Sequence, residues 1–386
     1  MEQDLTRFHI SRPAAFLKCV KARNYSCALI IDAAIRHHLE VHHIEGLSYV
    51  LSGNGREVFF HKQMAGQVAF GAMQIVQSKS ITIQILNRKG IPTPRSKRFG
   101  KHQKNDALRF FNKVRTDRAV MKPVEAAYGK GVHTGIRTQG DFEEAWSTIS
   151  RKWGSVIVEE FVPGVECRYF VLDSKVLAVT NRVPAHVVGD GISSVANLIS
   201  QKNDEARTQN VALKPVPDDD LSARVLAEQG LDMSSVPEGK RIVYLRNVSN
   251  ISQGGDSIDM TEAVHPSLKQ LAIDAVRAIP GLIYAGLDMI AEDHRRPLQG
   301  QIARILEIND YPMLSMHHFP AQGTARPVAD AVIRHIFFDD GPVDPSWIPF
   351  DQNLFMLRCF GPGSVRFRDE ILSAASPSNG EVPGAS

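Results

Sequence analysis

The chain has 386 residues, of which 43% are hydrophobic and 23% charged, so it has the composition of an ordinary folded protein and room for two or three packed units. Its formal net charge of +3 gives no reason to expect nucleic acid or a membrane as a partner. The polar N-terminus and the lack of a long apolar run predict a cytoplasmic protein without a signal peptide, and the four cysteines, without CxxC spacing, are expected to be reduced thiols.

The first unit, residues 1–76, is predicted to be a small α/β lead-in domain. Its pattern contains a helical stretch that breaks near Asn24, then a strand, and then a hairpin around Gly53-Asn54-Gly55. The corresponding residues are 13–36 for the helical stretch, 39–44 for the strand, and 48–51 and 57–60 for the two arms of the hairpin.

The second unit, residues 77–154, is predicted to be a lid-like subdomain. A capping box at Asp141 and Glu144 is expected to start its last helix. The basic stretch at 95–104 favours a solvated loop over a patch that attracts an anionic substrate. The expected elements are helices at 80–88, 106–116 and 141–151 and strands at 118–124 and 132–136.

The third unit, residues 155–340, is predicted to be a larger subdomain, and residues 341–386 a C-terminal extension that is partly disordered. One of its strands carries Glu166 and Arg168 between apolar neighbours. The other expected elements are strands at 155–161, 175–183, 242–245, 284–290 and 302–308, helices that begin near 195 and 265 and cover 327–337, and a polar turn at 185–191.

Residues 119–132 combine a short apolar strand with a glycine loop. Lys122 ends the strand, Pro123 breaks it, and Gly129 and Gly131 flank Lys130. Glycines let backbone N–H groups close on an anion, and a lysine at the end of a buried strand is well placed to meet one. The pattern is compatible with a loop that covers the phosphates of ATP, and also with a tight turn that carries a solvated lysine.

The commoner phosphate-binding and nucleophile motifs are absent from the sequence. No GxxxxGK[ST] occurs, no GxGxxG opens a helix after a strand, and no GxSxG elbow is present. The P-loop, Rossmann and serine-hydrolase patterns are therefore excluded.

Three oxygen-bearing side chains lie on the last two predicted strands. Glu307 and Asn309 are two residues apart and point to the same face, and Asp288 lies near the end of the preceding strand. Mg²⁺ prefers oxygen ligands and often binds one or two carboxylates together with substrate phosphates. If the two strands pair, the three side chains form a metal site; the alternative is that they are solvated groups at strand ends.

Several ordered stretches between residues 27 and 337 match the pattern of a known family. They are Ser78-Lys79-Ser80-Ile81-Thr82, Gly90-Ile91-Pro92-Thr93-Pro94, Lys122-Pro123 with Gly129 and Gly131, Val158–Val162, Gly164–Arg168, Arg182–Gly191 and Asn250–Gly255. This pattern resembles the ATP-grasp superfamily, most closely the ATP-grasp region of cyanophycin synthetase. The resemblance implies an α/β fold with α+β subdomains, in which the nucleotide is held between two β-sheet subdomains.

The resemblance also implies cofactors and site residues. ATP is the expected cofactor, with Mg²⁺ beside it as two ions, or Mn²⁺ as an alternative. The residues implied to bind ATP are Lys79 and Lys122 at the phosphates, Gly129 and Gly131 in the covering loop, Glu159, Glu160, Phe161 and Val162 in a hinge that holds adenine, and Glu166 at the ribose. The implied metal ligands are Asp288, Glu307 and Asn309, and the implied catalytic residues are Arg246, Ser252, Gly254 and Gly255.

The implied reaction joins a carboxylate to an amine through an acyl phosphate and releases ADP and phosphate. Its partners would be amino acids or short peptides, in a monomer or a homo-oligomer. Cyanophycin synthetase has a second ATP-using half and a further N-terminal region that this sequence lacks, so a stand-alone ligase is expected. Ser315, near His317, replaces an arginine of that branch, which leaves the choice of acid and amine open. The alternatives are a kinase of the same superfamily and a non-catalytic nucleotide-binding module.

Overall fold

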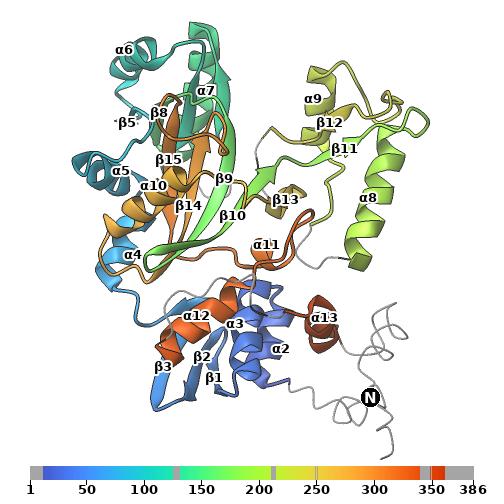
Figure 1. Ribbon diagram of the computed structural model, residues 1–386. Coiled ribbons are helices and arrows are strands. Elements are labelled where there is room, and N and C mark those ends of the chain that lie inside the picture. Colours follow the sequence, from blue (N-terminus) through green and yellow to red (C-terminus); the bar gives the residue numbers. More distant parts are fainter. Residues whose placement is uncertain are drawn as a thin grey trace, which may run out of the picture.

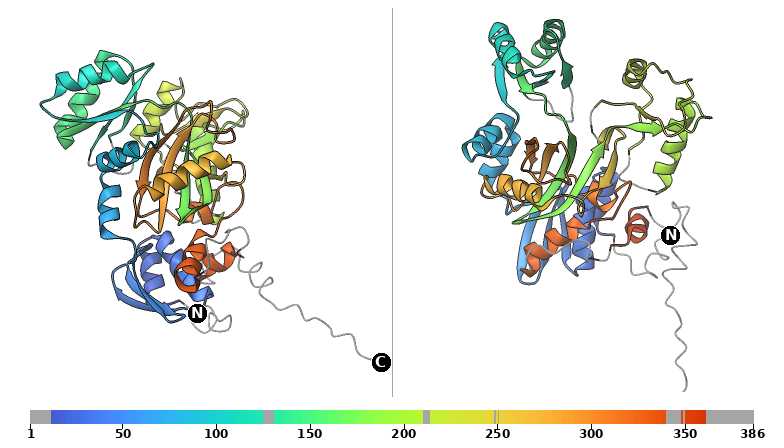
Figure 2. Two further views of the ribbon diagram at one scale, coloured as in Figure 1. Left: turned by 60° about the vertical axis from the view of Figure 1, so that its left-hand side comes forward. Right: turned by 45° about the horizontal axis from the view of Figure 1, so that its top comes forward.

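The computed structural model describes residues 12–124, 131–209, 214–247, 249, 251–339, 348 and 350–360. Figure 1 shows a central sheet with three smaller units around it: an N-terminal unit below, a lid at the upper left, and a lobe at the upper right. The lid and the lobe stand on either side of the central sheet in the right-hand view of Figure 2. No helix among the described residues is both long and apolar enough to cross a membrane.

The N-terminal unit packs helices against a four-stranded antiparallel sheet. The helical stretch breaks as predicted, because the Asn24 side chain caps the second helix by accepting from the Cys27 N–H at 3.0 Å. The predicted strand and hairpin are confirmed. The elements are α2 (Ala14–Lys21), α3 (Tyr25–Arg36), β1 (Glu40–Glu45), β2 (Ser48–Gly53), β3 (Arg56–His61) and β4 (Met64–Ala65), in the sheet order β1-β2-β3-β4.

Two cysteines of this unit correct the expectation of four reduced thiols. Cys19 and Cys27, whose Cα atoms lie 5.9 Å apart, form a disulfide across the turn between α2 and α3. Cys167 and Cys359 are free and buried.

The lid is an antiparallel sheet covered by two helices. Phe111, Phe142 and Trp146 fill the core between the helices and the sheet. The elements are β5 (Ser96–Gly100), β6 (Ala119–Pro123), β7 (His133–Ile136) and β8 (Ser155–Glu160), in the order β5-β8-β6-β7, with α6 (Lys104–Val114) and α7 (Gln139–Trp153). Helices α4 (Phe70–Gln77) and α5 (Lys79–Arg88) lead into the lid from the N-terminal unit.

Two predictions for the lid are wrong. The basic stretch is not a solvated loop, because residues 96–100 form β5 and pair with β8. The cap of α7 is Thr138 rather than Asp141: the Asp141 N–H donates to the Thr138 hydroxyl, and the Asp141 carboxylate accepts from the Thr138 N–H, which closes the capping box. Strand β8, assigned to the third unit by the sequence, pairs with β5 and β6 of the lid.

The central sheet is antiparallel and presents two different faces. Alternate residues of β9, such as Cys167 and Tyr169, pack toward α10 (Pro266–Arg277), so the intervening Arg168 points to the opposite face. The predicted pairing of the last two strands is confirmed, with Asp288 directly across from Glu307. The strands are β13 (Asp256–Asp259), β10 (Lys175–Val183), β9 (Val165–Leu172), β14 (Tyr284–Ala291) and β15 (Ala303–Asn309), in this spatial order.

The lobe extends from the central sheet between β10 and β13. The prediction of a polar turn at residues 185–191 is incomplete, because these residues contain strand β11. Strand β13 was also not predicted. The elements of the lobe are β11 (His186–Val188), β12 (Ile242–Tyr244), α8 (Val195–Gln209), α9 (Asp220–Glu228) and the 3₁₀ turn η1 (Ile251–Gln253) that leads back to the central sheet.

The last helices return the chain to the N-terminal unit. Helix α11 (Ser315–His318) follows β15, and α12 (Val328–Phe338) packs against α3. Helix α13 (Gln352–Phe360), which the sequence did not predict, lies beside α2 and α3 in Figure 1. The rest of the predicted C-terminal extension, including the disordered tail, lies outside the described residues.

Candidate active site

A cleft of about 920 Å³ lies between the lid, the central sheet and the N-terminal unit. Its lining comes from elements that are far apart in the sequence, from the turn before α3 to helix α11. The predicted site residues that line it are Lys79, Lys122, Glu159, Glu160, Phe161, Val162, Glu166, Asp288, Glu307 and Asn309. The fold therefore brings the predicted nucleotide and metal residues to one place.

The lid side of the cleft carries a buried ion pair. Lys122 on β6 and Glu159 on β8 lie on neighbouring strands, and the Lys122 Nζ donates to Glu159 Oε1 at 2.8 Å. Met121 points into the lid core, so the period of the strand turns Lys122 toward the cleft. Only 4% of Glu159 is exposed, and its ion pair with Lys122 holds the lysine in position.

Residues 160–162 link the lid sheet to the central sheet. The Glu160 carboxylate turns to Arg95, whose Nε lies 2.8 Å from Oε2. Glu159 is engaged by Lys122, so neither carboxylate of this link is free. What the link can offer a ligand in the cleft is its backbone together with Phe161 and Val162, which both line the cavity.

Two arginines and an aspartate form a charged cluster on the cleft face of the central sheet. Arg168 on β9 lies opposite Asp288 on β14, and its Nη2 donates to Asp288 Oδ2 at 3.0 Å. Arg182 on β10 lies 3.0 Å from the same oxygen and also pairs with Glu166. Burial raises the pKa of Asp288, but Arg168 and Arg182 outweigh it and hold the pKa below its usual value, so the carboxylate is ionised.

Glu307 and Asn309 occupy the end of β15 beside this cluster. The Asn309 Nδ2 donates to Glu307 Oε1 at 3.2 Å, and the Lys79 Nζ lies 3.4 Å from Glu307 Oε2. The Glu307 side chain remains 29% exposed. One lysine from α5 and two oxygen-bearing side chains from β15 therefore meet at the cleft.

The donor set partly fits a divalent cation. Glu307 and Asn309 supply the oxygen atoms that Mg²⁺ prefers and face the cleft. Asp288 fits less directly, because both of its oxygens accept hydrogen bonds from Arg168. Within the described parts of the chain, no group of three or more His, Cys, Asp and Glu side chains could hold a metal ion.

Arg246 lies away from the cleft lining. It is buried, its Nη2 lies 2.7 Å from Asp219 Oδ2, and its Nη1 donates to the Ser222 hydroxyl and the Leu245 carbonyl, each at 2.7 Å. The guanidinium thus ties β12 to the start of α9. In this structure its donors are used inside the lobe.

The predicted glycines are placed as follows. Gly254 and Gly255 do not line the cleft, and Gly254, with φ +86°, sits where a Cβ would come within 2.8 Å of the Val216 Cα. Gly131, with φ +73°, sits where a Cβ would lie 2.8 Å from the Trp153 ring, and it precedes Val132, which lines the cleft. Gly129 and the side chain of Ser252 lie outside the described residues.

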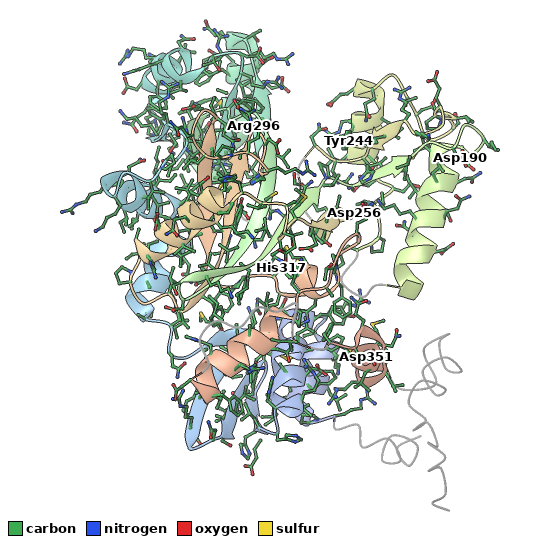
Figure 3. The ribbon with its side chains drawn as sticks, in the orientation of Figure 1. Asp190, Tyr244, Asp256, Arg296, His317 and Asp351 are labelled. Atoms are coloured by element: carbon green, nitrogen blue, oxygen red, sulfur yellow. A yellow bond between two sulfur atoms is a disulfide. The ribbon has the colours of Figure 1, made fainter. Side chains whose placement is uncertain are left out.

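No role was predicted for Arg168 and Arg182, although both fall in stretches that resemble the family. The available signal was the alternation of Glu166 and Arg168 on one strand, which puts two charges on one face. His317 lies between the central sheet and the N-terminal unit (Figure 3), with Nδ1 2.8 Å from the Thr180 hydroxyl. Burial, with Arg168 nearby, lowers the pKa of His317, so the ring is neutral.

Comparison with known proteins agrees with this geometry. Residues 77–186 match the family model of the phosphoribosylglycinamide synthetase ATP-grasp (A) domain. The chain belongs to the ATP-grasp superfamily. The predicted resemblance is thereby confirmed, and the fold is shown by a solved structure, that of a bifunctional glutathione synthetase from Pasteurella multocida. That structure superposes with a TM-score of 0.64 at 31% identity and covers 82% of this chain and 44% of that one.

Two relatives are longer proteins, of which this ATP-grasp chain matches only a part. The glutathione biosynthesis bifunctional protein GshAB of P. multocida is 35% identical over 303 residues, which are 76% of this chain and 38% of the relative. Cyanophycin synthetase of Nostoc sp. is 34% identical over 277 residues, which are 71% of this chain and 30% of the relative. The chain therefore spans less than half the length of these relatives.

Proposed function

We propose that this ATP-grasp protein is an ATP-dependent ligase that joins a carboxylate to an amine. In the first step a carboxylate oxygen attacks the γ-phosphorus of ATP, the bond to ADP breaks, and an acyl phosphate forms. In the second step the amine nitrogen attacks the carbonyl carbon, phosphate leaves, and the nitrogen loses a proton. Amino acids or short peptides are the proposed substrates, in line with the names of the relatives.

The observation that carries the proposal is the convergence of Lys79, Lys122, Glu307 and Asn309 on one cleft. Phosphoryl transfer needs mainly positioning and charge stabilisation from the protein. Lys79 and Lys122 provide fixed cations for the phosphates, and residues 160–162 provide backbone groups for the base. Glu166, which lies on β9 and lines the cleft, is the proposed partner of the ribose.

Glu307 and Asn309 are the proposed ligands of Mg²⁺, with Asp288 as a buried neighbour that adds negative charge. When bound, the metal neutralises phosphate charge. Arg168 and Arg182 balance Asp288 and can face the acyl group on the same sheet face. The proposed catalytic positions remain Arg246, Ser252, Gly254 and Gly255. To act on the substrate, Arg246 has to break its ion pair with Asp219 and form one with the substrate.

The test is ADP release from ATP by the full chain, with a panel of amino acids offered as acid and as amine. Release that requires both partners, with a new amide in the product, is the expected result. A stable phosphorylated product from a single substrate would instead identify a kinase. ATP binding without any turnover across the panel would favour a binding module.

A further inference from the structure

Two cations that line the cleft are left without an acidic partner. Arg23 lies in the turn between α2 and α3, and Lys214 lies in the segment between α8 and α9. No ion pair joins either of them to any residue in the described part of the chain. The two side chains come from different units and reach the same cavity.

The other charged residues of the cleft are already balanced. Every lining carboxylate except one pairs with a cation: Glu159 with Lys122, Glu160 with Arg95, Glu166 with Arg182, Asp288 with Arg168, and Glu307 with Lys79. The exception, Asp310, accepts from the Gln77 amide at 3.0 Å. Arg23 and Lys214 are therefore the cations of the cleft lining that have no carboxylate partner among the described residues.

The two cations line the same part of the cleft, near the start of α3. The Lys214 Nζ lies over the Tyr25 ring, 5.9 Å from its centroid, and Tyr25 is two residues after Arg23 in the sequence. Burial lowers the pKa of Lys214, and the charge of Arg23 lowers it further. Lys214 is half-buried and Arg23 is exposed at the edge of the same cleft, so an anion bound between them would offset the repulsion between the two charges.

The start of α3 adds to this positive potential. Asn24 caps the helix, and Tyr25 and Ser26 of its first turn line the cleft. Helix α3 has 12 residues, and the N-terminus of such a helix favours a bound anion, because its first N–H groups lack partners within the helix.

We propose that Arg23 and Lys214 form an anion subsite. The subsite binds a substrate carboxylate that is different from the carboxylate activated by ATP. The inference rests on the proposed ligase function and narrows its substrate class to compounds with a second carboxylate. The nucleotide phosphates are assigned to Lys79 and Lys122, on α5 and the lid, so the subsite serves the acid or the amine. The carboxylate can belong to the side chain of the acid or be the α-carboxylate of the amine.

The test measures ADP release with pairs of substrates that differ in one charge. Aspartate is compared with asparagine, and glutamate with glutamine, each as acid, and an amino acid is compared with its α-carboxamide as amine. The variants are Arg23→Ala, Lys214→Ala and the charge-conserving Lys214→Arg. Lys89→Ala and Arg277→Ala, at exposed positions outside the cleft, are the matched controls.

For one pair, the wild type is expected to have a KM about tenfold lower for the charged member than for the neutral one. This factor corresponds to the free energy of a hydrogen bond to a charged group. Arg23→Ala and Lys214→Ala should remove that preference with little change in kcat or in the Kd of ATP, while Lys214→Arg and the controls keep it. The pair that shows the preference tells whether acid or amine supplies the carboxylate. Equal use of charged and neutral members by the wild type, or a weakened Kd of ATP in the variants, would overturn the proposal.

Absence of turnover with every pair would refute the ligase function but not decide the subsite. Calorimetry with glutarate decides it separately. Binding to the wild type that weakens about tenfold in both alanine variants supports an anion subsite. No binding, or equal binding to wild type and variants, overturns it.

Discussion

Lys122 illustrates how a residue of the cleft serves both the fold and the proposed chemistry. The side chains of Lys122 and Glu159 are 12% and 6% exposed, so the charge of each one compensates for the burial of the other. Removing the lysine alone therefore leaves an unpaired charge inside the lid. A loss of ATP binding in such a variant would be confused with a loss of folding.

A double replacement separates these two effects. Lys122→Met is expected to lower the free energy of unfolding by about 3–5 kcal/mol, because Glu159 stays buried without a partner. Adding Glu159→Gln should recover most of that loss while the Kd of ATP remains at least about tenfold weaker. Urea unfolding and calorimetry measure the two quantities. If the double variant binds ATP like the wild type, Lys122 is not a nucleotide ligand.

Glu307 and Asn309 allow a cleaner experiment, because Glu307 is partly exposed and its replacement leaves no buried charge behind. Glu307→Ala and Asn309→Ala are each expected to lower ADP release by about 10²–10³-fold, the usual loss when a group that stabilises transferred charge is removed. Urea unfolding should be nearly unchanged. Glu57→Ala, exposed on β3, is the control for the loss of one carboxylate. Normal turnover in both variants would refute the metal assignment.

The ladder of β9, β14 and β15 determines where the charged groups of the cleft meet. Asp288 has Arg168 opposite it on one side and Glu307 on the other, so three charges lie in one row across the sheet. Side chains on the other face of the same strands form an apolar core with α10. The strand period thus separates a core face from a functional face.

This row predicts how stability depends on pH. The pKa of Asp288 is lower in the folded chain than the value of about 3.9 in an unfolded one, so its stabilising effect is complete well above that value. It is lost as the pH falls through the folded-state pKa. The difference in unfolding free energy between the wild type and Asp288→Asn should be largest near neutral pH and shrink below about pH 4. A difference that stays constant or grows on acidification would contradict this.

The elements also show which parts of the structure the sequence could predict. Long, largely apolar strands, such as β14 and β15, and the helical break at Asn24 were identified. Strands β11 and β13, of three and four residues, are too short for periodicity and are held by pairing with distant segments. The burial of Arg246 against Asp219 depends on the packing of the lobe, which no local pattern contains.

At the scale of the whole molecule, the two ends of the described chain form one core. Phe16 and Leu51 from the N-terminal unit, Phe170 from the central sheet, and Phe337 and Phe355 from α12 and α13 belong to the same buried cluster. Arg358 on α13 lies 2.9 Å from Asp32 on α3, and both side chains are buried. The C-terminal helix therefore supports α3, whose first turn lines the cleft.

Replacing Phe355 tests whether α13 is part of this core. Its ring is fully buried, with the Phe16, Phe319 and Phe350 ring centroids 6.1, 5.5 and 6.2 Å away. Phe355→Ala is expected to lower the free energy of unfolding by about 3–5 kcal/mol, because it removes buried apolar area and leaves a cavity between α2 and α13. Phe70→Ala is the matched control, since that ring is 73% exposed on α4 and should cost far less. Urea unfolding measures both, and a loss for Phe355→Ala no greater than that of the control would mean that α13 does not contribute to the fold in solution.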